Sequence, residues 1–402
     1  MSVTKSEDLA DNYGFAVNCF LRKDVLTPAY VGVSEGIAIE ESRVNSFVCA
    51  GYSKVAKAHF FIGTTKIRVS SDEHNFDKQT SKRVSSAFIV EDFVDGELRP
   101  VVVNNSIASV YDADSESFQS YPIGKRLDCG TMHRGRLFGA TQYTVYWSGP
   151  KGVTDWEAGI HGCGYLVLDS ARGEVLNMLE YKGKLVLVRE YGLTVLNMKN
   201  PPENFSVDYT ETDCGVIYKN SAQVVGNRIY FCSESGLKCF DGTKISPLEI
   251  RCAVSTAWSS AEYGGRYFLA CNSDVLGRKV ILCVDSADGE SCIIDEGADW
   301  LYVNDGIWFV YNRELKRLEE GGSFIFKSAP IDFGTDSQKT VTKIRFSGRP
   351  IITANNGRFE RRFENKRFFV RPHMRGRSFT FTVSDTKPVK GVTVSAEVNN
   401  AV

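Results

Sequence analysis

The 402-residue sequence contains no apolar run of about 18 residues, so no transmembrane helix is expected. Its start, MSVTKSEDLADNYGF, lacks a basic end followed by an apolar stretch, so no secretory signal is expected either. Lys and Arg (48) nearly balance Asp and Glu (49), leaving a net charge of −1. This balance gives no whole-molecule field that would favour nucleic acid or a membrane surface.

Sequence patterns typical of catalysis and metal binding are also missing. The eleven cysteines form no C-x-x-C pair, which favours thiols in a reducing cytoplasm over a disulfide scaffold. Phosphate-binding glycine motifs and a Ser, His and acid order are absent. YDADSESF (111–118) begins like a calcium loop but lacks its glycine and closing glutamate, so a solvated hairpin turn is predicted. The sequence therefore predicts no catalytic residue, no metal and no cofactor; the protein is not expected to be an enzyme.

The sequence does contain a recurring unit. YKGKLVLVREYGLTVLN (181–197) and VVGNRIYFCSESGLKCFDG (224–242) share a turn, an apolar run, a polar pair and a second alternating run. Such units are spaced by 36 to 48 residues. They begin near Ala58, Arg99, Gly135, Gly183, Asn227, Gly265 and Gly306. Each resembles the central hairpin of a four-stranded sheet, and periods of about 40–45 residues are typical of propeller blades.

These units predict an all-β fold. We expect a β-propeller over 55–322 with six to eight blades, seven or fewer being favoured. Longer alternating strands over 323–402 predict a small antiparallel β-sandwich. Residues 1–54 are expected to form an arm and strands that close the ring or pack beneath it. The alternative is a pair of β-sandwiches whose hairpins are regularly spaced.

The loop WSGPKGVTDWEAG (147–159) has two interpretations. Asp155 and Glu157 alternate, as an acid/base or metal-binding pair would. No second ligand pair accompanies them, so a structural loop is favoured. In that interpretation Pro150 helps to turn the chain and Asp155 caps a short turn. Trp147 and Trp156 are then expected to be buried at a blade junction.

One region departs from the charge balance. From Lys339 to Arg377 there are twelve Lys or Arg and two acids, a net of +10, which leaves −11 for the rest of the chain. Strand alternation would place many of these arginines on one face, which suits phosphate or an acidic protein surface. The predicted partner-binding residues are Arg358, Arg361, Arg362, Arg367, Arg371, Arg375 and Arg377.

The order of several segments resembles a known family. They are GRLF, YWSGPKGVTDWEAG, GEVLNMLEYKGKLVLVREYGLTVL, GNRIYFCSESGLKCFDG, SAPIDFG, KTVTKIRFSG and RGRSFTFTVS. Over about 130–402 the chain is similar to β-propeller structural proteins of tailed bacteriophages. The nearest group is the tail nozzle, or tail tubular protein B, of short-tailed phages, with related head-completion propellers. This chain is shorter than typical nozzle proteins.

The resemblance implies a non-enzymatic virion protein. It implies a homo-oligomeric ring, commonly sixfold, in the tail nozzle or head–tail connector region through which DNA passes. Expected partners are other virion proteins, namely a connector or portal-side adaptor and tail subunits. The expected location is the virion tail, after assembly in the cytoplasm of a bacterial host. The family provides no catalytic residues.

Two other functions remain open at this point. A carbohydrate- or receptor-binding propeller on a phage or bacterial surface would carry aromatic residues at equivalent positions in each repeat. The tryptophans lie unevenly, at positions 147, 156, 258, 300 and 308. A hydrolase propeller would need carboxylates or histidines that converge on its channel. The strand starts AHFF, PVVV, RLFG and KLVL offer almost none.

Overall fold

The computed structural model describes residues 2–11, 13–38, 47–71, 75–80, 82–158, 162–199, 202–212, 214–250, 253–364 and 368–399. Within these ranges the elements are β-strands, apart from the short 3-10 helices η1 (Gly152–Thr154), η2 (Ser170–Arg172) and η3 (Pro202–Asn204). The predicted all-β fold is confirmed. Among the described residues, no helix is long and apolar enough to cross a membrane.

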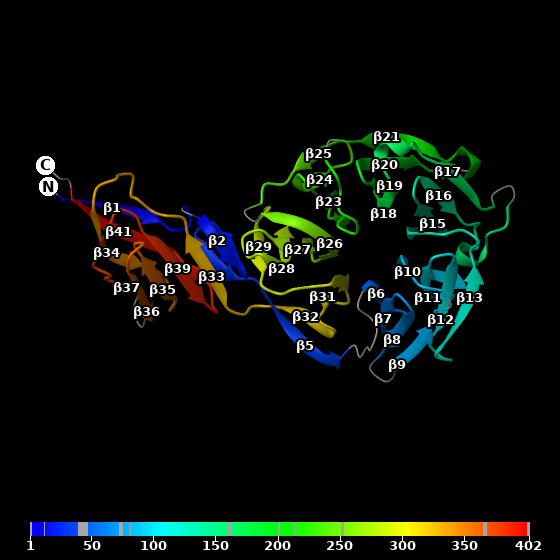
Figure 1. Ribbon diagram of the computed structural model, residues 1–402, viewed down its shortest axis with the longest axis horizontal. Helices are drawn as coiled ribbons and strands as arrows, with labels where there is room; N and C mark the ends of the chain where they lie inside the picture. Colours follow the sequence, from blue (N-terminus) through cyan, green and yellow to red (C-terminus); the bar gives the residue numbers. More distant parts are fainter. Residues whose placement is uncertain are drawn as a thin grey trace.

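Seven blades of four strands each, counted over the described residues, surround a central axis in the propeller seen in Figure 1. Six of them are separate sheets, and the strands of the seventh are part of a larger sheet. Blade 1 contains β6 (Phe47–Ser53), β7 (Ala58–Gly63), β8 (Lys66–Ser70) and β9 (Asn75–Gln79). Blade 2 contains β10 (Ala87–Val94), β11 (Glu97–Asn104), β12 (Ile107–Asp112) and β13 (Ser117–Pro122). Blade 3 contains β14 (Cys129–His133), β15 (Arg136–Thr141), β16 (Thr144–Trp147) and β17 (Gly164–Val167).

The other blades continue in chain order. Blade 4 contains β18 (Val175–Tyr181), β19 (Lys184–Arg189), β20 (Gly192–Asn197) and β21 (Ser206–Glu211). Blade 5 contains β22 (Gln223–Val225), β23 (Arg228–Ser233), β24 (Gly236–Phe240) and β25 (Ile245–Pro247). Blade 6 contains β26 (Val254–Tyr263), β27 (Arg266–Ser273), β28 (Arg278–Asp285) and β29 (Ser291–Ile294). Blade 7 contains β30 (Trp300–Val303), β31 (Ile307–Tyr311), β32 (Glu314–Glu320) and β5 (Tyr30–Ala38).

The sequence repeat corresponds to the turn and second strand of each blade. In blades 3 and 4 the first two strands are joined by Arg134-Gly135 and Lys182-Gly183, and all four residues have positive φ. Two consecutive positive φ values are required by a type I′ turn, whose twist matches that of the flanking strands. The second strands, such as β7 and β19, are almost entirely buried, whereas outer strands such as β9 alternate. A buried strand reads as a continuous apolar run, which made the repeat visible.

The cores lie between blades rather than within them. One apolar cluster packs Phe138 and Trp147 of blade 3 against Leu187 and Phe205 of the blade 4 region. Equivalent clusters join each neighbouring pair of blades around the described ring. A four-stranded sheet cannot bury both faces alone, so each blade depends on its two neighbours.

Ring closure pairs a strand from the N-terminal region with a strand of the last blade. β5, from the N-terminal region, pairs antiparallel with β32 as the outermost strand of blade 7, with Lys316 opposite Ser34. A further cluster, including Phe61 of blade 1 and Val310 of blade 7, seals the joint between the last blade and the first. The N-terminal region therefore supplies the strand that completes the ring.

A β-sandwich extends from the propeller, and both chain ends lie at its far end (Figure 1). One sheet contains β1 (Ser2–Asp8), β41 (Thr393–Asn399), β34 (Lys339–Arg345), β37 (Phe369–Val370) and β38 (Met374–Gly376). The other contains β2 (Tyr13–Val17), β33 (Phe324–Ser328), β39 (Thr380–Asp385), β35 (Ile351–Asn355) and β36 (Glu360–Glu364). Phe326, Val341 and Phe381 are among the residues that fill the core between the sheets. Residues 2–17 thus belong to the sandwich together with the C-terminal strands.

The sandwich and the propeller share a sheet. β2 pairs in parallel with β29 of blade 6, at Val17 and Ile293, so nine strands form one continuous sheet. Beside it, β3 (Cys19–Arg22), β4 (Val25–Pro28) and β40 (Val389–Lys390) form a small sheet. There Asp285 accepts hydrogen bonds from Arg22 at 2.6 Å and from Arg266 at 3.2 Å. Arg266 also pairs with Glu320 of β32 at 3.0 Å, so one ionic network joins the sandwich side, blade 6 and blade 7.

We predict that Asp285→Ala lowers the free energy of unfolding by about 1–2 kcal/mol, because two partly buried guanidinium groups lose a shared acceptor. Asp305→Asn is the matched control, since Asp305 pairs with Lys54 at 3.2 Å while both side chains are mostly exposed, and Asn tolerates the positive φ of this position. That variant should change stability by less than about 0.5 kcal/mol. Urea unfolding of both variants checks this, and equal losses would contradict it.

Candidate functional site

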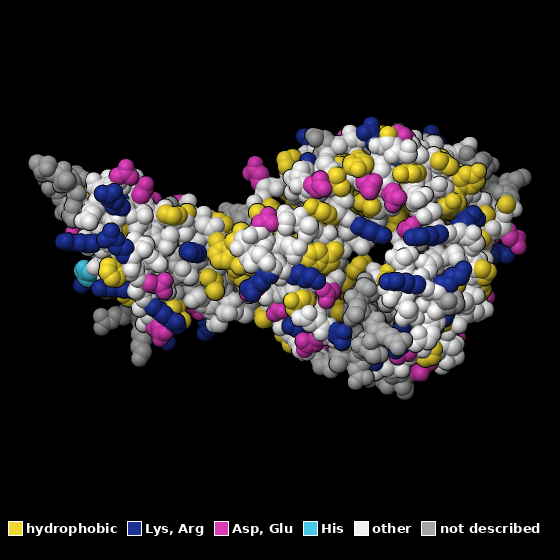
Figure 2. Space-filling view, viewed as in Figure 1, with side chains coloured by type: hydrophobic (Ala, Val, Ile, Leu, Met, Phe, Trp, Pro, Cys, Tyr) yellow, Lys and Arg dark blue, Asp and Glu magenta, His cyan; other side chains and the backbone are white. Residues whose placement is uncertain are grey.

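The first strands of all seven described blades line a central cavity of about 1200 Å³. Figure 2 shows its opening in the middle of the propeller. This volume lies somewhat above the roughly 300–1000 Å³ that is typical of small-molecule sites. Its wall carries the cations Arg83 and Lys219 and several carboxylates. The channel is therefore the first place to look for catalytic or binding chemistry.

The carboxylates of this wall already have structural partners. Asp128 accepts hydrogen bonds from Ser86 and Thr141, both at 2.6 Å, and from Arg126 at 2.8 Å. Burial raises the pKa of Asp128, but these hydrogen bonds outweigh that effect, so its pKa lies below the usual value. Asp299 pairs with Lys279 at 2.6 Å. These groups tie neighbouring strands and blades together, and an ionised, fully bonded Asp128 is a poor proton donor.

The described residues contain no group of three or more His, Cys, Asp or Glu placed to hold a metal ion. His161 follows the loop in the sequence, six positions after Asp155, and lies outside the described residues. Cys163 lies near Trp156, with its Sγ 3.0 Å from the Trp156 carbonyl oxygen. Most described cysteines are buried in strands, and burial raises the pKa of the Cys49 thiol to about 12. Such a thiol is a small apolar side chain, not a nucleophile.

The loop after Trp147 is an ordered turn fastened to the neighbouring blade. Its residues 152–154 form η1, and the amide of Gly149 donates to the Asp155 carbonyl oxygen at 2.7 Å. Asp155 also accepts from the Lys151 amide through Oδ2, at 3.4 Å. Pro150 is exposed at the outside of the turn. The backbone carbonyl oxygen of Asp155 and one of its carboxylate oxygens thus both accept hydrogen bonds from the backbone of the loop itself.

Asp92 of β10, which the sequence did not single out, fastens this loop to blade 2. Its Oδ2 accepts a hydrogen bond from the Val153 amide at 2.7 Å, and its side chain is buried. A Cβ on Gly152 would come within 1.9 Å of the same oxygen, and Gly152 has φ of +68°. Position 152 therefore requires glycine for two reasons, the backbone conformation and the approach of the carboxylate.

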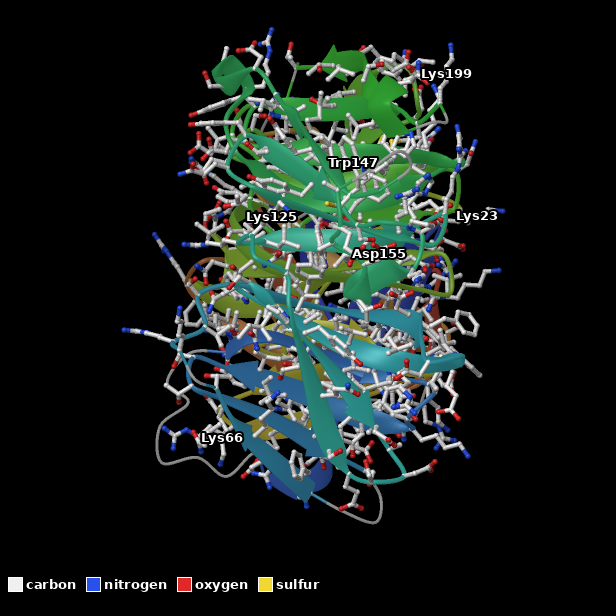
Figure 3. All side chains as sticks on the ribbon, turned by 90° about the vertical axis from the view of Figure 1, so that its right-hand side faces the viewer. Lys23, Lys66, Lys125, Trp147, Asp155 and Lys199 are labelled. Atoms are coloured by element: carbon white, nitrogen blue, oxygen red, sulfur yellow. The ribbon has the colours of Figure 1, made fainter. Side chains whose placement is uncertain are left out.

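The two loop tryptophans lie on opposite sides of blade 3. Trp147 is buried between blades 3 and 4, with its ring 5.2 Å from that of Phe205. Figure 3 shows Trp147 inside the protein and Asp155 lower in the view, toward the cyan strands of blade 2. Trp156 packs toward blade 2 but is only half-buried, and Lys125 lies 5.3 Å from its ring. Trp156 therefore buries part of its surface at the junction of blades 2 and 3, as the structural interpretation of the loop expected, although less completely than Trp147.

The described members of the predicted arginine set belong to the β35–β36 turn, to β36 and to the segment that runs from β37 to just past β38. Figure 2 shows Lys and Arg side chains over the end of the sandwich that is far from the propeller. The turn between β35 and β36 lies against the segment joining β37 to β38. Asn356 donates to the Arg375 carbonyl at 2.7 Å, and Arg361 donates to the Pro372 carbonyl at 2.9 Å. We call this surface the basic tip. It consists of Arg358, Phe359, Arg361, Arg362, Phe368, Arg371, Arg375 and Arg377, whereas Arg367 lies outside the described residues.

The tip differs from the expected one-sided face. Arg361 pairs with Ala354 across the strands and Arg362 with Thr353, so the two arginines point to opposite faces of the sheet. Ala354 belongs to the core. Arg361 lies on the same side of the sheet as Ala354, and its guanidinium donates to the Pro372 carbonyl oxygen. The arginines are brought together by the edges of two sheets, not by alternation along one strand. Arg361 and Arg375 meet the β35–β36 turn at this edge, whereas Arg362 lies on the other face. Phe368 lies beside Phe346, at the other end of β34.

Phe359 is 70% exposed and Phe368 is 75% exposed, which is unusual for side chains of this size. Arg371 lies over the ring of Phe369 at 5.6 Å, and Lys343 lies over it at 4.7 Å. Exposed aromatic rings among arginines are typical of binding surfaces. Among the large apolar side chains of the described residues, these two are the most exposed.

No protein-family model and no curated protein matches the sequence. The fold matches solved structures. The WD40 domain of Neurospora crassa Pan2 aligns with a TM-score of 0.51 at 8% identity, covering 73% of this chain and 96% of that one. The extracellular domain of a B. thetaiotaomicron protein described as a hybrid two-component system aligns with a TM-score of 0.50 at 14% identity, covering 83% and 48%. At these identities the likeness shows the β-propeller fold alone.

We predict a specific pH dependence for Asp92. Burial raises its pKa above the ordinary 3.8, so the folded protein holds that proton more tightly than the unfolded chain does. Wild-type stability relative to Asp92→Asn should therefore fall as pH rises from below 3.8 through the raised folded pKa, and then stay level. Urea unfolding of both proteins across this range measures the difference. A difference that moves in favour of the wild type with rising pH would contradict it.

The tryptophans should differ in their contribution to stability. Trp147→Ala leaves a cavity between two blades and should cost about 3–5 kcal/mol. Trp156→Ala removes a half-buried ring and should cost about 1–2 kcal/mol. Chemical unfolding of the two variants tests this order. Equal costs would show that Trp156 is as important to packing as Trp147.

Proposed function

We propose that the chain is a non-enzymatic structural protein of a tailed bacteriophage virion. In this proposal it forms a ring subunit of the tail nozzle or head–tail connector region and binds other virion proteins. The order of sequence segments that resembles the phage propeller proteins supports this assignment. The coarser conclusion, a β-propeller of the kind that serves binding or scaffolding, does not depend on it.

The basic tip is the single structural observation that carries the proposal. It lies at the end of a sandwich that shares a continuous sheet with blade 6. A force on the tip is therefore transmitted to the propeller through the backbone hydrogen bonds of that sheet. A propeller that works alone on a small ligand in its channel needs no such projecting, charged arm. A cavity of about 1200 Å³ within one propeller has roughly the dimensions of a ligand site, so in this proposal DNA passes through the centre of the ring that the subunits form.

A glycan- or receptor-binding propeller is the second candidate. Tyr146 and Tyr165 are opposite each other on neighbouring strands of blade 3, with ring centroids 6.2 Å apart, and Tyr165 is 64% exposed. Lys125 lies over both Tyr146 and Trp156. Aromatic faces beside a cation suit sugar rings. This patch belongs to one blade, whereas the basic tip draws on both sheets of a separate sandwich.

Disrupting the gene in the phage that carries it should give DNA-filled heads without a complete tail and no infectious particles. Mass spectrometry of intact purified particles should find the chain at a fixed ratio to the other tail proteins. Normal particles from the disrupted phage, or particles that lack the chain, would contradict the proposal.

Replacing Arg358, Arg361 and Arg362 together with Ser should leave the fold intact, because all three are exposed, but should keep the protein out of particles. The matched control replaces Lys57, Lys199 and Lys244, which are also exposed, with Ser. Circular dichroism establishes folding, and incorporation into particles is the measured result. Equal incorporation of both variants would exclude a role for the tip.

A further inference from the structure

The basic tip has a counterpart at the opposite end of the molecule. The β10–β11 and β12–β13 turns lie at the same end of blade 2, since the strands of the blade run alternately up and down. We call this end the acidic corner. It contains Asp95, Glu97, Asp112, Asp114 and Glu116, with Arg99 as its single cation. Arg99 contacts Glu97 at 2.7 Å and Asp112 at 3.4 Å, which shows that the two turns are neighbours.

The corner is apolar as well as acidic. Phe93 and Leu98 are opposite each other on β10 and β11, and Phe93 is 67% exposed. The corner thus pairs an exposed aromatic ring with a net charge of −4, from five carboxylates and one arginine. The described part of the tip pairs Phe359 and Phe368 with +4, from six arginines and two glutamates. The two surfaces are complementary in charge and alike in apolar character.

We propose that the basic tip of one copy docks on the acidic corner of a second copy. The inference rests on the proposed function, because it names the contact that would build the ring. Figure 1 places the sandwich tip and blade 2 at opposite ends of the long axis, so one molecule cannot join its own two surfaces. A contact between different surfaces of identical chains is heterologous, and it produces closed rings or open filaments according to the rotation between copies.

The ion pairs that already exist leave charge available for such a contact. Within the tip Arg362 pairs with Glu364 at 2.9 Å, with both side chains mostly exposed, so little would be lost by exchanging that partner. In the corner, Asp112 accepts hydrogen bonds from the backbone amides of Asp114 and Ser115, at 3.0 and 3.3 Å. These bonds fix the conformation of the turn. A preformed turn and a preformed hairpin lose little conformational entropy on docking.

Sedimentation velocity of the purified full-length chain, at rising concentration, provides the test. The tip variant carries Arg358→Glu, Arg362→Glu and Arg375→Glu. The corner variant carries Asp95→Lys, Glu97→Lys and Asp114→Lys. We expect the wild type to form associated species that weaken in high salt, because the screening length shrinks from about 10 Å at 0.1 M to about 3 Å at 1 M. Each variant alone should lose association.

An equimolar mixture of the two variants should associate again, since each tip then meets a corner of opposite charge. The matched control, Lys57→Glu with Lys199→Glu and Lys244→Glu, makes the same charge change elsewhere and should associate like the wild type. Circular dichroism and urea unfolding establish that each variant folds. Restored association in the mixture cannot be explained by misfolding of either component.

Other outcomes separate this inference from the proposed function. Association that is lost in the tip variant but kept in the corner variant would overturn the corner and leave the virion role standing. If the chain stays monomeric at every concentration but is found in intact particles, the tip–corner contact is overturned and the virion role stands. A chain absent from the particles would overturn the virion role, whatever it does in solution.

Discussion

The fold depends on the pairing of β5 with β32, which joins an N-terminal strand to the last blade. The apolar clusters lie between blades, so a blade without a neighbour would expose one face of its sheet. Seven described blades in chain order would still leave an open seam between blade 7 and blade 1. β5 completes blade 7, and the contact of Phe61 with the blade 7 cluster seals the seam.

The same N-terminal segment connects the propeller to the sandwich. β2 precedes β5 in the chain and pairs with both β29 of blade 6 and β33 of the sandwich. Arg22 and Arg266 hold Asp285 beside this joint, and both guanidinium groups lie over the ring of Phe20, at 5.1 and 5.7 Å from its centre. The connection is therefore a sheet and an ionic network rather than a linker. It holds the basic tip at a fixed distance from the blades, as a docking arm requires.

Much of the propeller could be predicted because its signals are local. Turn pairs such as Lys182-Gly183 and the buried strands that follow them are visible within a few residues of sequence. The strand that closes the ring could not be identified from the sequence, because Ser34 and its hydrogen-bond acceptor Glu314 are separated by 280 positions. The Asp92 contact with Val153 spans 61 positions and has no motif. The tip arginines were recognisable from composition, but their arrangement depends on the register of β36 with β35, which places Arg361 opposite Ala354, and on the contact of Arg361 with Pro372. The solvated hairpin turn predicted over 111–118 is confirmed, since β12 and β13 flank an exposed turn there. The contact that we propose for the acidic corner leaves no local signal, because its partner surface is distant in the sequence.

Hydrogen exchange measured on the intact chain tests the closed ring most directly. In 30–38 the amides that donate to β32 should exchange as slowly as those of 314–320, since neither strand of that pair can open without breaking the ring. Outward-facing amides of β5 should exchange faster than those of inner strands such as β19, because β5 is the outermost strand of blade 7. Fast exchange at every amide of 30–38 while 300–320 stays protected would show an open propeller, and the account of a ring closed by the N-terminal region would be wrong.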